Sequence, residues 1–542
     1  MLGRINPPRQ AGFSYHQVMS DTRLSTEHLH QGSAVETVQS LIVAFVLAMT
    51  FRGFVTEGFV IPTGSMAPTL MGRHLLLHSD QTGVTYPIDT RRGRRSIRAG
   101  YDPMLGRNHP LDSINISAHR PRMGDRILVL KCLYPFAEPQ RFDVVVFKNP
   151  TDPDGDAENY IKRLIGLPNE AIWLVDGDLF VGSADDPDNF DAYEIKRKPL
   201  HLQRAAWQPV HHSDYIPIHP ERLPGRYAAP WFGENWKTTN SRRYRCDTAE
   251  PSTLQWSLQQ IALDDWVPYN MQSFRGSRLY PVSDLRVTAA ILPDQAGLET
   301  TLELETRGHL FQFVLTPYDE AMYEAVVRMR PVDEPDEWAQ DSGLIVAPKP
   351  GQVFNVEFWH VDQSMAIYVD GNRVAYCEYS WPPRRRLELA YGRAYETVVG
   401  KLPTIMPTAP LLRWDFRGSP VTLHRVQVDR DLYYRPERLD PTKQKNDPQI
   451  RGPAFGTHPD NLAILGPDHF YMLGDNSPAS SDSRLWGSPH PLVATQIDPS
   501  PFVVNRKLLL GKAWVVYFPA PYPVTEGGRG VIPDFARLRF VR

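Results

Sequence analysis

Short apolar or alternating runs, bounded by turn residues, recur along most of the chain. Runs of about four to eight such residues, flanked by glycine, proline, asparagine or aspartate, are typical of β-strands. The strands predicted in this way cover residues 126–130, 143–147, 159–167, 171–181 (a hairpin), 300–305, 309–315, 353–360, 365–369, 469–473 and 508–518. Asp176-Gly177 and Asp370-Gly371 have the composition of two-residue hairpin turns. The chain is therefore predicted to be mainly β, with 508–518 as a buried strand.

One apolar run differs from the strands in length. Residues 40–51 carry no charge, and the wider stretch 34–55 contains only Glu36 and Arg52 as charged residues. A membrane-spanning helix needs about 20 mainly apolar residues. We therefore expect a transmembrane helix over 34–55, with a buried core helix or a cleaved secretory signal as the alternatives. Residues 1–33 have no regular apolar period and are predicted to be flexible. Basic residues flank the run on both sides, so the positive-inside rule gives only a weak preference for an N-terminus in the cytoplasm.

The composition is that of an ordinary globular protein of more than one domain. The 542 residues are 42% hydrophobic and 22% charged, and the net charge of −3 argues against a dedicated nucleic-acid binder. The three cysteines, Cys132, Cys246 and Cys377, are too far apart for a zinc knuckle or a disulfide framework. Buried thiols are the favoured interpretation, and a bridge between Cys246 and Cys377 is left open.

The character of the sequence changes between about 185 and 445, where prolines and tryptophans precede further alternating strands. Residues 354–374 include a Val-Asp-Gly turn and resemble lectin-like jelly-roll domains of the laminin-G and concanavalin type. That resemblance implies a β-sandwich and no particular ligand. We expect 185–445 to be an inserted sandwich that folds independently and contributes no catalytic side chain.

The two flanking segments, 56–184 and 446–542, are predicted to form one catalytic core. The first contains a polar, turn-rich insertion at 79–122. Within this insertion lies a basic run made of Arg91, Arg92, Arg94, Arg95 and Arg98. A solvated loop is the simplest interpretation of the run, and contact with anionic lipid headgroups is the alternative.

The first candidate for chemistry is Ser65, in the sequence PTGSMAPT at 62–69. Gly64 has no Cβ, and we expect this to let a substrate backbone approach Ser65. A serine hydroxyl becomes a good nucleophile only when a base takes its proton. The Thr63 hydroxyl and the Ser65 N–H are candidates to face a developing oxyanion. Taken alone, the segment is interpreted as a turn with a buried hydroxyl.

The second candidate is Lys162. Alternation along the predicted strand 159–167 puts it on the same face as Tyr160 and Leu164. A buried lysine must be paired or neutral. To be neutral at pH 7, its pKa must fall by about 3.4 from a reference of about 10.4, at a cost of roughly 4.6 kcal/mol. Burial is known to lower lysine pKa values by that much. Lys162 is thus a candidate general base, and an amine reaching solvent at a sheet edge is the alternative.

The third element is the loop at 474–487, GDNSPASSDSRLWG. It is dense in turn formers and short polar side chains, so an Asx-rich turn without a catalytic role is one interpretation. Asp482 and Arg484 are predicted to pair and fix the loop. A hydroxyl from this loop is a candidate to donate a hydrogen bond to Lys162 and aim its lone pair at Ser65.

Together, these segments resemble the type I signal peptidase (leader peptidase) family. The order is the family's: a membrane helix, PTGSMAPT, the DVVVF strand at 143–147, YIKRLIGLP at 160–168, and the GDN…SSDSRLWG loop. The resemblance covers about 36–70, 124–181 and 462–518, and it does not extend to 185–445.

By position, the resemblance implies that Ser65 is the nucleophile and Lys162 the general base. Ser480 matches the hydroxyl that orients the lysine, and Thr63 matches the side chain that joins the Ser65 N–H in the oxyanion hole. Ser481 remains an alternative to Ser480, because the preceding residues 477–479, Ser-Pro-Ala, depart from the family's usual Arg-Asp-Asn. The residues expected to line shallow pockets for small side chains are Phe59, Ile61 and Ile161, and those expected in structural polar pairs are Arg163, Asp475, Asp482 and Arg484.

Together with the lectin-like resemblance of 354–374, the signal peptidase resemblance implies an α+β, mainly β fold with an N-terminal membrane helix and a β-rich core interrupted by a jelly-roll-like sandwich. It implies a serine endopeptidase that cleaves signal peptides from exported preproteins through an acyl-enzyme, with no metal or cofactor. The expected location is the cytoplasmic membrane, single-pass, with the catalytic part on the extracytoplasmic face. The expected partners are signal peptides and the lipid bilayer, and no nucleic acid.

Two alternatives to this function are kept. One is a self-processing or repressor-type serine–lysine peptidase, against which the membrane helix and the 474–487 loop argue. The other is a membrane-anchored protein that binds a glycan or a protein through the sandwich and has an inactive peptidase core.

Overall fold

The computed structural model describes residues 34–90, 100–111, 120–153, 159–223, 227–239, 242–273, 278–334, 338–444, 446–523 and 531–542. The predicted flexible segment 1–33 and the arginine run at 91–98 lie outside these ranges. The chain divides into two units, one ending at Phe54 and one running from Val55 to Arg542.

The first unit contains helix α1 (Ala34–Thr50), which continues as a π-helical turn over Phe51–Val55. Val35–Val55 is a 21-residue, mainly apolar span whose residues are not buried within the protein. By length and composition this helix is able to cross a membrane. The exposed apolar side chains along it do not fit the alternative of a buried core helix.

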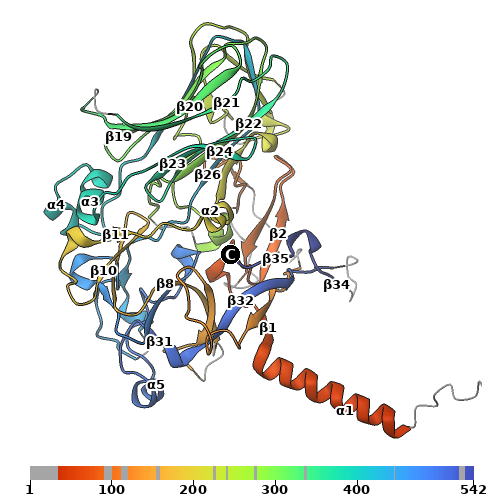
Figure 1. Ribbon diagram of the computed structural model, residues 1–542, viewed down its shortest axis with the longest axis vertical. Coiled ribbons are helices and arrows are strands. Elements are labelled where there is room, and N and C mark those ends of the chain that lie inside the picture. Colours follow the sequence, from red (N-terminus) through yellow and green to blue (C-terminus); the bar gives the residue numbers. More distant parts are fainter. Residues whose placement is uncertain are drawn as a thin grey trace, which may run out of the picture. The chain divides into compact units, whose positions relative to one another are not determined.

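The second unit contains a large sheet built mainly from the strands predicted on both sides of the sandwich. Its order is β1-β6-β32-β7-β8-β30-β31, with β35 beside β32 (Figure 1). The bounds are β1 (Thr56–Val60), β6 (Arg126–Leu130), β7 (Val144–Lys148), β8 (Asn159–Gly166), β30 (His469–Leu473), β31 (Val504–Asn505), β32 (Leu509–Phe518) and β35 (Arg539–Phe540). Side chains alternate between two apolar clusters: Val144 and Val146 pack in one, Val145 and Phe147 in the other. This alternation fixes which residues of β8 face which cluster.

The prediction that 508–518 is a buried strand is wrong for part of its length. β32 forms as predicted, but Trp514 is 42% exposed and Tyr517 is 40% exposed. Ala513 and Val516 point into the core and are almost fully buried. An apolar run by itself predicted burial on both faces of the strand. In the structure, the core packs against the face that carries Ala513 and Val516, and the face that carries Trp514 and Tyr517 stays exposed.

A four-stranded sheet, β11-β10-β9-β29, and several two-stranded pairs accompany the large sheet. The four strands are β9 (Glu170–Val175), β10 (Asp178–Ser183), β11 (Glu194–Ile195) and β29 (Ala463–Ile464). The pairs are β2 (His74–His78) with β3 (Thr85–Asp89), β4 (Gly100–Tyr101) with β5 (Pro110–Leu111), β27 (Arg438–Leu439) with β28 (Gly452–Pro453), and β33 (Tyr522–Pro523) with β34 (Val531–Ile532).

Two further sheets form the predicted β-sandwich. One has the order β14-β15-β26-β17-β22-β23-β24 with β12 on β26, and the other β13-β16-β25-β18-β19-β20-β21. The first sheet contains β12 (Gln208–His212), β14 (Trp236–Thr239), β15 (Arg243–Cys246), β17 (Leu285–Pro293), β22 (Phe354–Val361), β23 (Ser364–Val369), β24 (Asn372–Glu378) and β26 (Val421–Arg430). The second contains β13 (Trp231–Phe232), β16 (Ser252–Trp256), β18 (Glu299–Thr306), β19 (His309–Pro317), β20 (Met322–Pro331), β21 (Ala339–Val346) and β25 (Leu411–Arg417).

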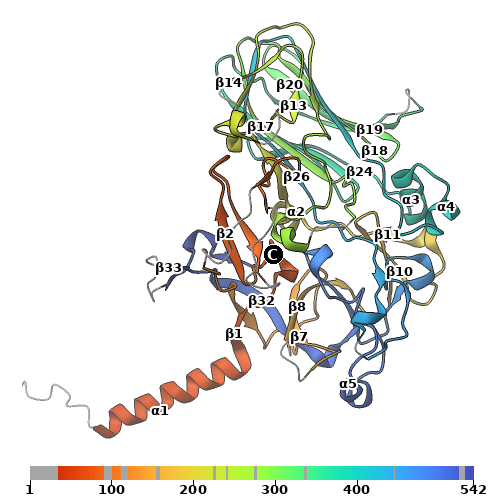
Figure 2. The same ribbon diagram turned by 180° about the vertical axis from the view of Figure 1, so that it is seen from behind.

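The two sandwich sheets lie face to face, as Figures 1 and 2 show for β19 and β20 against β24 and β26. One apolar cluster fills the space between them, with Trp231, Trp414, Phe313 and Phe358 among its members. Both predicted hairpin turns are present, since Asp176, Gly177, Asp370 and Gly371 all have positive φ. That is the backbone conformation of a type I′ turn. The mainly β fold with an apolar N-terminal helix and a β-sandwich is therefore confirmed.

The segment predicted as an independent insertion is joined closely to the rest of the second unit. Helices α3 (Pro383–Tyr391) and α4 (Tyr395–Val399) pack against the β9–β10 hairpin, and Trp173, Leu387 and Val398 share one buried cluster. α2 (Leu200–Ala206) also lies in the 185–445 segment, whereas α5 (Pro491–Gln496) follows it. Strand β11 of the segment pairs with β10 of the core. The segment therefore shares a buried cluster and a strand pairing with the core, and its independent folding stays a prediction.

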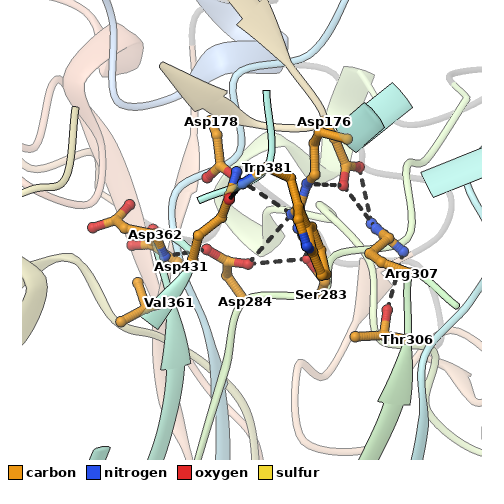
Figure 3. Close-up of polar contacts among 12 residues, drawn as sticks. Asp176, Asp178, Ser283, Asp284, Thr306, Arg307, Val361, Asp362, Trp381 and Asp431 are labelled. Atoms are coloured by element: carbon orange, nitrogen blue, oxygen red, sulfur yellow. Dashed lines mark hydrogen bonds and ion pairs between the residues drawn. The ribbon is translucent and has the colours of Figure 1, made fainter. Parts of the chain in front are cut away.

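A buried ion-pair network strengthens this junction (Figure 3). Asp176, in the β9–β10 turn, binds Arg307 through contacts of 2.7 and 2.9 Å, and Arg386 Nε lies 2.9 Å from the same carboxylate. Lys198 contacts Asp362 and lies 2.7 Å from Asp431. Because these groups are buried, removing one partner of a pair leaves a charge that water cannot reach.

Cys132, Cys246 and Cys377 are all free thiols, so the bridge left open between Cys246 and Cys377 is absent. Cys246 is buried, and its Sγ lies 3.3 Å from the Ser252 hydroxyl.

Candidate active site

Ser65 lies in a single 3-10 turn, Gly64–Met66, that follows β1. Thr63 caps the turn in an extended conformation, and the Ala67 N–H closes it on the Gly64 carbonyl at 3.0 Å. Gly64, Ser65 and Met66 are all buried. The turn therefore holds the serine hydroxyl inside the protein.

Lys162 lies on β8, where it pairs with Val145 of β7. Its Nζ is 2.8 Å from the Ser65 Oγ and 3.2 Å from the Ile161 carbonyl. Ser65 is 5% exposed and Lys162 is 4% exposed. The aromatic ring of Tyr160, on the same face of the strand, has its centroid 5.0 Å from the amine. The structure thus brings together the two residues that the sequence analysis selected separately.

The role that the sequence suggested for Gly64 is different in the structure. A Cβ at this position would lie 2.1 Å from the Tyr269 ring. The space beside Gly64 is therefore occupied by a side chain of the 185–445 segment, and not left open for a substrate backbone. The need for glycine comes from this close packing.

The 474–487 loop reaches the Ser65 turn through its backbone. The Asn476 N–H donates to the Ser65 carbonyl at 3.0 Å, and the Asn476 amide Nδ2 donates to the Gly64 carbonyl at 2.8 Å. A Cβ on Gly474 would lie 2.5 Å from the Ser65 carbonyl oxygen and 2.2 Å from the Ser480 Oγ. Only glycine allows the loop to come this close.

Ser480 and Ser481 differ sharply in position. Ser480 is buried beside the Ser65 turn, and its Oγ makes no hydrogen bond within the described ranges. Ser481 is exposed. Of the two candidates, Ser480 is therefore the one located at the site.

The four residues predicted in polar pairs form two buried ion pairs. Arg163 binds Asp475 through Nε–Oδ1 and Nη2–Oδ2 contacts of 2.7 and 2.6 Å. Arg484 binds Asp482 in the same two-pronged way at 2.9 and 2.8 Å. Thr69, from the end of the serine segment, also donates to Asp475.

The Arg163–Asp475 pair joins the loop to β8, and the Arg484–Asp482 pair braces the loop internally. Burial by itself lowers the pKa of the Arg163 guanidinium, but the charge and hydrogen bonds of Asp475, together with Tyr434 and Asp143, raise that pKa above its usual value. Asp482 accepts the Gly474 N–H at 3.1 Å, and Arg484 donates to the Ser477 hydroxyl at 2.8 Å. The pairs hold the loop in the conformation that meets Ser65.

Phe59, Ile61 and Ile161 belong to one apolar cluster together with Met66. Phe59 and Ile161 are partly exposed, whereas Ile61 is almost fully buried. Thr63, the remaining predicted residue, is half-buried, and its side chain makes no capping hydrogen bond. All eleven residues singled out from the sequence thus lie on β1 or in the segment from its end to the Ser65 turn, on β8, or in the 474–487 loop.

Sequence reasoning missed the contribution of Asn476, Asn270 and Tyr269. Asn476 lies inside the Gly-Asp-Asn motif, so its position was a usable signal. Asn270 and Tyr269 lie in an irregular stretch of the 185–445 segment, where no local pattern marks them. Only the folded chain brings them to Ser65.

One group of carboxylates has a geometry that could hold a metal. Among the residues described, Asp178, Asp284 and Asp362 have oxygens within 4.8 Å of one another. Arg386 Nη2 already lies 3.4 Å from Asp178 and 3.8 Å from Asp284, and Lys198 contacts Asp362. Protein cations therefore occupy the cluster, and we assign no metal to it.

Comparison with known proteins gives a family match. Residues 108–220 match the family model for signal peptidase, peptidase S26. This range includes Lys162 and not Ser65 or the 474–487 loop.

Curated relatives extend the match. The chain is 26% identical over 237 residues to signal peptidase I of Pseudomonas aeruginosa and 24% identical over 232 residues to that of Pseudomonas fluorescens. In each case 41% of this chain and 66% of the relative are covered. It is also 29% identical over 139 residues to signal peptidase I of Buchnera aphidicola, covering 26% of this chain and 31% of the relative.

Solved structures match a different part of the fold. A galectin of Caenorhabditis elegans, LEC-6, is 16% identical and matches 27% of this chain and 82% of its own, with a TM-score of 0.18. A carbohydrate-binding module, CBM66, of Bacillus subtilis is 9% identical and matches 37% of this chain and 96% of its own, with a TM-score of 0.21. Scores this low assign no ligand. The family-model match and the curated relatives confirm the resemblance to the type I signal peptidase family that the motifs indicated.

Proposed function

We propose that this chain is a membrane-anchored serine endopeptidase that cleaves signal peptides from exported preproteins, with Ser65 as nucleophile and Lys162 as general base. The observation that carries the proposal is the 2.8 Å contact between the Lys162 Nζ and the Ser65 Oγ, with both side chains buried. A buried amine at this distance is within reach of the proton that a serine nucleophile must lose.

In the first half of the reaction, the Ser65 Oγ attacks the carbonyl carbon of the scissile peptide bond while Lys162 takes the hydroxyl proton. The tetrahedral intermediate then expels the amine of the mature protein, which receives that proton from Lys162. The product of this half is an ester between Ser65 and the signal peptide.

In the second half, Lys162 takes a proton from a water molecule, and the water oxygen attacks the ester carbonyl. The Ser65 oxygen leaves and is reprotonated by Lys162. The signal peptide departs with a free carboxylate, and the enzyme returns to its starting state.

Three groups support this cycle in the proposal. The Ser65 N–H and the Thr63 hydroxyl stabilise the oxyanion, a role that suits donors fixed in place before the charge develops. The Ser480 hydroxyl, buried beside the Ser65 turn without a hydrogen bond in the described part of the chain, orients the Lys162 amine.

The substrate proposal depends on the apolar cluster of Phe59, Ile61 and Ile161. These side chains line shallow pockets that accept small residues at the −1 and −3 positions of the preprotein. The helix over 34–55 anchors the enzyme in the cytoplasmic membrane, with the Val55–Arg542 unit on the extracytoplasmic face. Signal peptides are held in the same bilayer, so anchoring raises the local concentration of substrate.

The test is cleavage of a model preprotein with an Ala-x-Ala site by the purified full-length protein in detergent. Wild type should release the mature product, and Ser65→Ala should not. A folded wild type that binds the preprotein or a glycan without cleaving it would instead favour the binding-protein alternative.

A further inference from the structure

The 185–445 segment reaches the nucleophile. Its 3-10 stretch Pro268–Ser273 contains Tyr269, whose ring fills the space beside Gly64, and Asn270. Tyr269 also shares a buried apolar cluster with Ala67, two residues after Ser65. This stretch therefore packs against residues that precede and follow the serine in sequence.

Asn270 and Asn476 form a reciprocal amide pair, although 206 residues separate them in the chain. The Asn270 Nδ2 donates to the Asn476 Oδ1 at 2.5 Å, and the Asn476 Nδ2 donates to the Asn270 Oδ1 at 2.9 Å. Asn270 is 9% exposed and Asn476 is fully buried. Water is therefore a poor substitute for either partner.

Asn476 in turn holds the peptide groups around the nucleophile. Its backbone N–H donates to the Ser65 carbonyl, and its Nδ2 donates to the Gly64 carbonyl as well as to Asn270. A primary amide has two N–H donors and one carbonyl acceptor. The contacts to Gly64 and Asn270 use both donors, and the Asn270 Nδ2 uses the acceptor. The orientation of this amide is thus set by Asn270.

We infer that Asn270 is a positioning residue for Ser65, acting through Asn476. The pair fixes the carbonyls of Gly64 and Ser65, and these define the direction of both the Ser65 Oγ and the Ser65 N–H. Without Asn270, the buried Asn476 amide loses a side-chain partner of matching shape and is free to rotate away from Gly64. The inference rests on the proposed function, because it concerns the geometry of that nucleophile.

This contact differs from the other contacts that the segment makes with the core. Asp176 with Arg307 and Arg386 ties the segment to the β9–β10 turn, which carries none of the proposed catalytic groups. The Asn270–Asn476 pair is directed at the Ser65 turn. The segment is therefore part of the framework of the active site.

The test compares Asn270→Ala, Asn476→Ala and the double variant with wild type, using the full-length protein and a fluorescent signal-sequence peptide. Misplacing a catalytic group by about 1 Å costs on the order of 10²-fold in rate. We expect Asn270→Ala to lower kcat by about tenfold to hundredfold with KM within about threefold. The double variant should be no slower than Asn476→Ala, because both act on one arrangement.

A matched control is Asn355→Ala in the sandwich, which removes an amide that bonds to Asp370 in the β23–β24 turn. It should leave kcat unchanged. If Asn270→Ala fails to fold, Asn270→Asp has the same shape, keeps the acceptor and loses the donor, and it should also lower kcat.

The outcomes separate the two proposals. A folded Asn270→Ala or Asn270→Asp with wild-type kcat, beside an active wild type and an inactive Ser65→Ala, overturns this inference alone. Additive losses in the double variant would show that Asn270 acts apart from Asn476 and would also overturn it. A folded wild type that does not cleave ends the proposed function and this inference with it.

Discussion

The Nζ of Lys162 lies 2.8 Å from the Oγ of Ser65, although 97 residues separate the two in sequence. Ser65 follows strand β1, and Lys162 lies inside strand β8, with β6, β32 and β7 between these strands in the sheet. The short distance therefore depends on the tertiary fold, which brings the turn after β1 close to β8 although three strands lie between them in the sheet.

Removing either member of this pair should abolish cleavage. Ser65→Ala leaves no nucleophile, and Lys162→Ala leaves no base, so each should reduce kcat by roughly 10⁴-fold or more. Lys162→Arg should also be inactive, because a guanidinium does not give up its proton in a protein. Circular dichroism would establish that the variants are folded, and peptide hydrolysis would measure the loss. An active Lys162→Arg would mean that the lysine is structural.

Ser480 and Ser481 make a matched pair for testing the orienting hydroxyl. Ser480→Ala removes the buried Oγ beside the Ser65 turn, and kcat should fall at least about tenfold, equivalent to about 1.4 kcal/mol of barrier. Ser481→Ala changes an exposed side chain and should behave like wild type. Steady-state kinetics would measure kcat for both variants. Equal losses of kcat in the two would contradict the assignment of Ser480, and not Ser481, as the orienting residue.

The Arg163–Asp475 ion pair should be important for stability. Both side chains are buried, so Asp475→Asn leaves the Arg163 guanidinium without its anion. Breaking a buried pair in this way costs about 3–5 kcal/mol of unfolding free energy. Denaturant titration followed by tryptophan fluorescence would measure it. The exposed pair of Glu194 and Lys196 supplies the control, since Glu194→Gln should leave the midpoint unchanged.

The buried carboxylate cluster should make stability depend on pH. Burial and then the Asp284 carboxylate raise the pKa of Asp178 well above its usual range, and Arg386 offsets this only in part. Asp362 raises it further and Lys198 lowers it. An aspartate in an unfolded chain has a pKa of about 3.9.

The direction in which stability changes with pH follows from the difference between the Asp178 pKa in the folded protein and in the unfolded chain. Since the folded protein binds this proton more tightly, the stabilisation is complete below about pH 4 and is lost as pH rises through the folded-state pKa. Asp178→Asn should therefore unfold at a higher temperature than wild type at pH 8, with the gap closing toward pH 4. Asp185→Asn, at an exposed position after the same strand, is the control. A gap that is constant from pH 4 to pH 8 would contradict the prediction.

The sequence by itself determined the elements and the candidate residues. Alternating apolar positions placed β6, β7, β8, β22 and β23 to within one or two residues, because strand periodicity is a local property. The 34–55 helix followed from length and composition. Ser65, Lys162 and the Asp482–Arg484 pair were identified from motifs, each within a short stretch of chain.

Only the tertiary structure decided which residues from distant parts of the chain contact one another. Nothing near Gly64 in sequence shows that the Tyr269 ring lies beside it, and nothing near Asn270 shows that it bonds to Asn476. The choice between Ser480 and Ser481 as the residue at the site, and the exposure of Trp514 on a strand predicted to be buried, depend likewise on which surfaces the fold covers. Local propensity acts over a few residues, whereas these contacts join segments hundreds of residues apart. They are fixed by the packing of the whole chain from Val55 to Arg542.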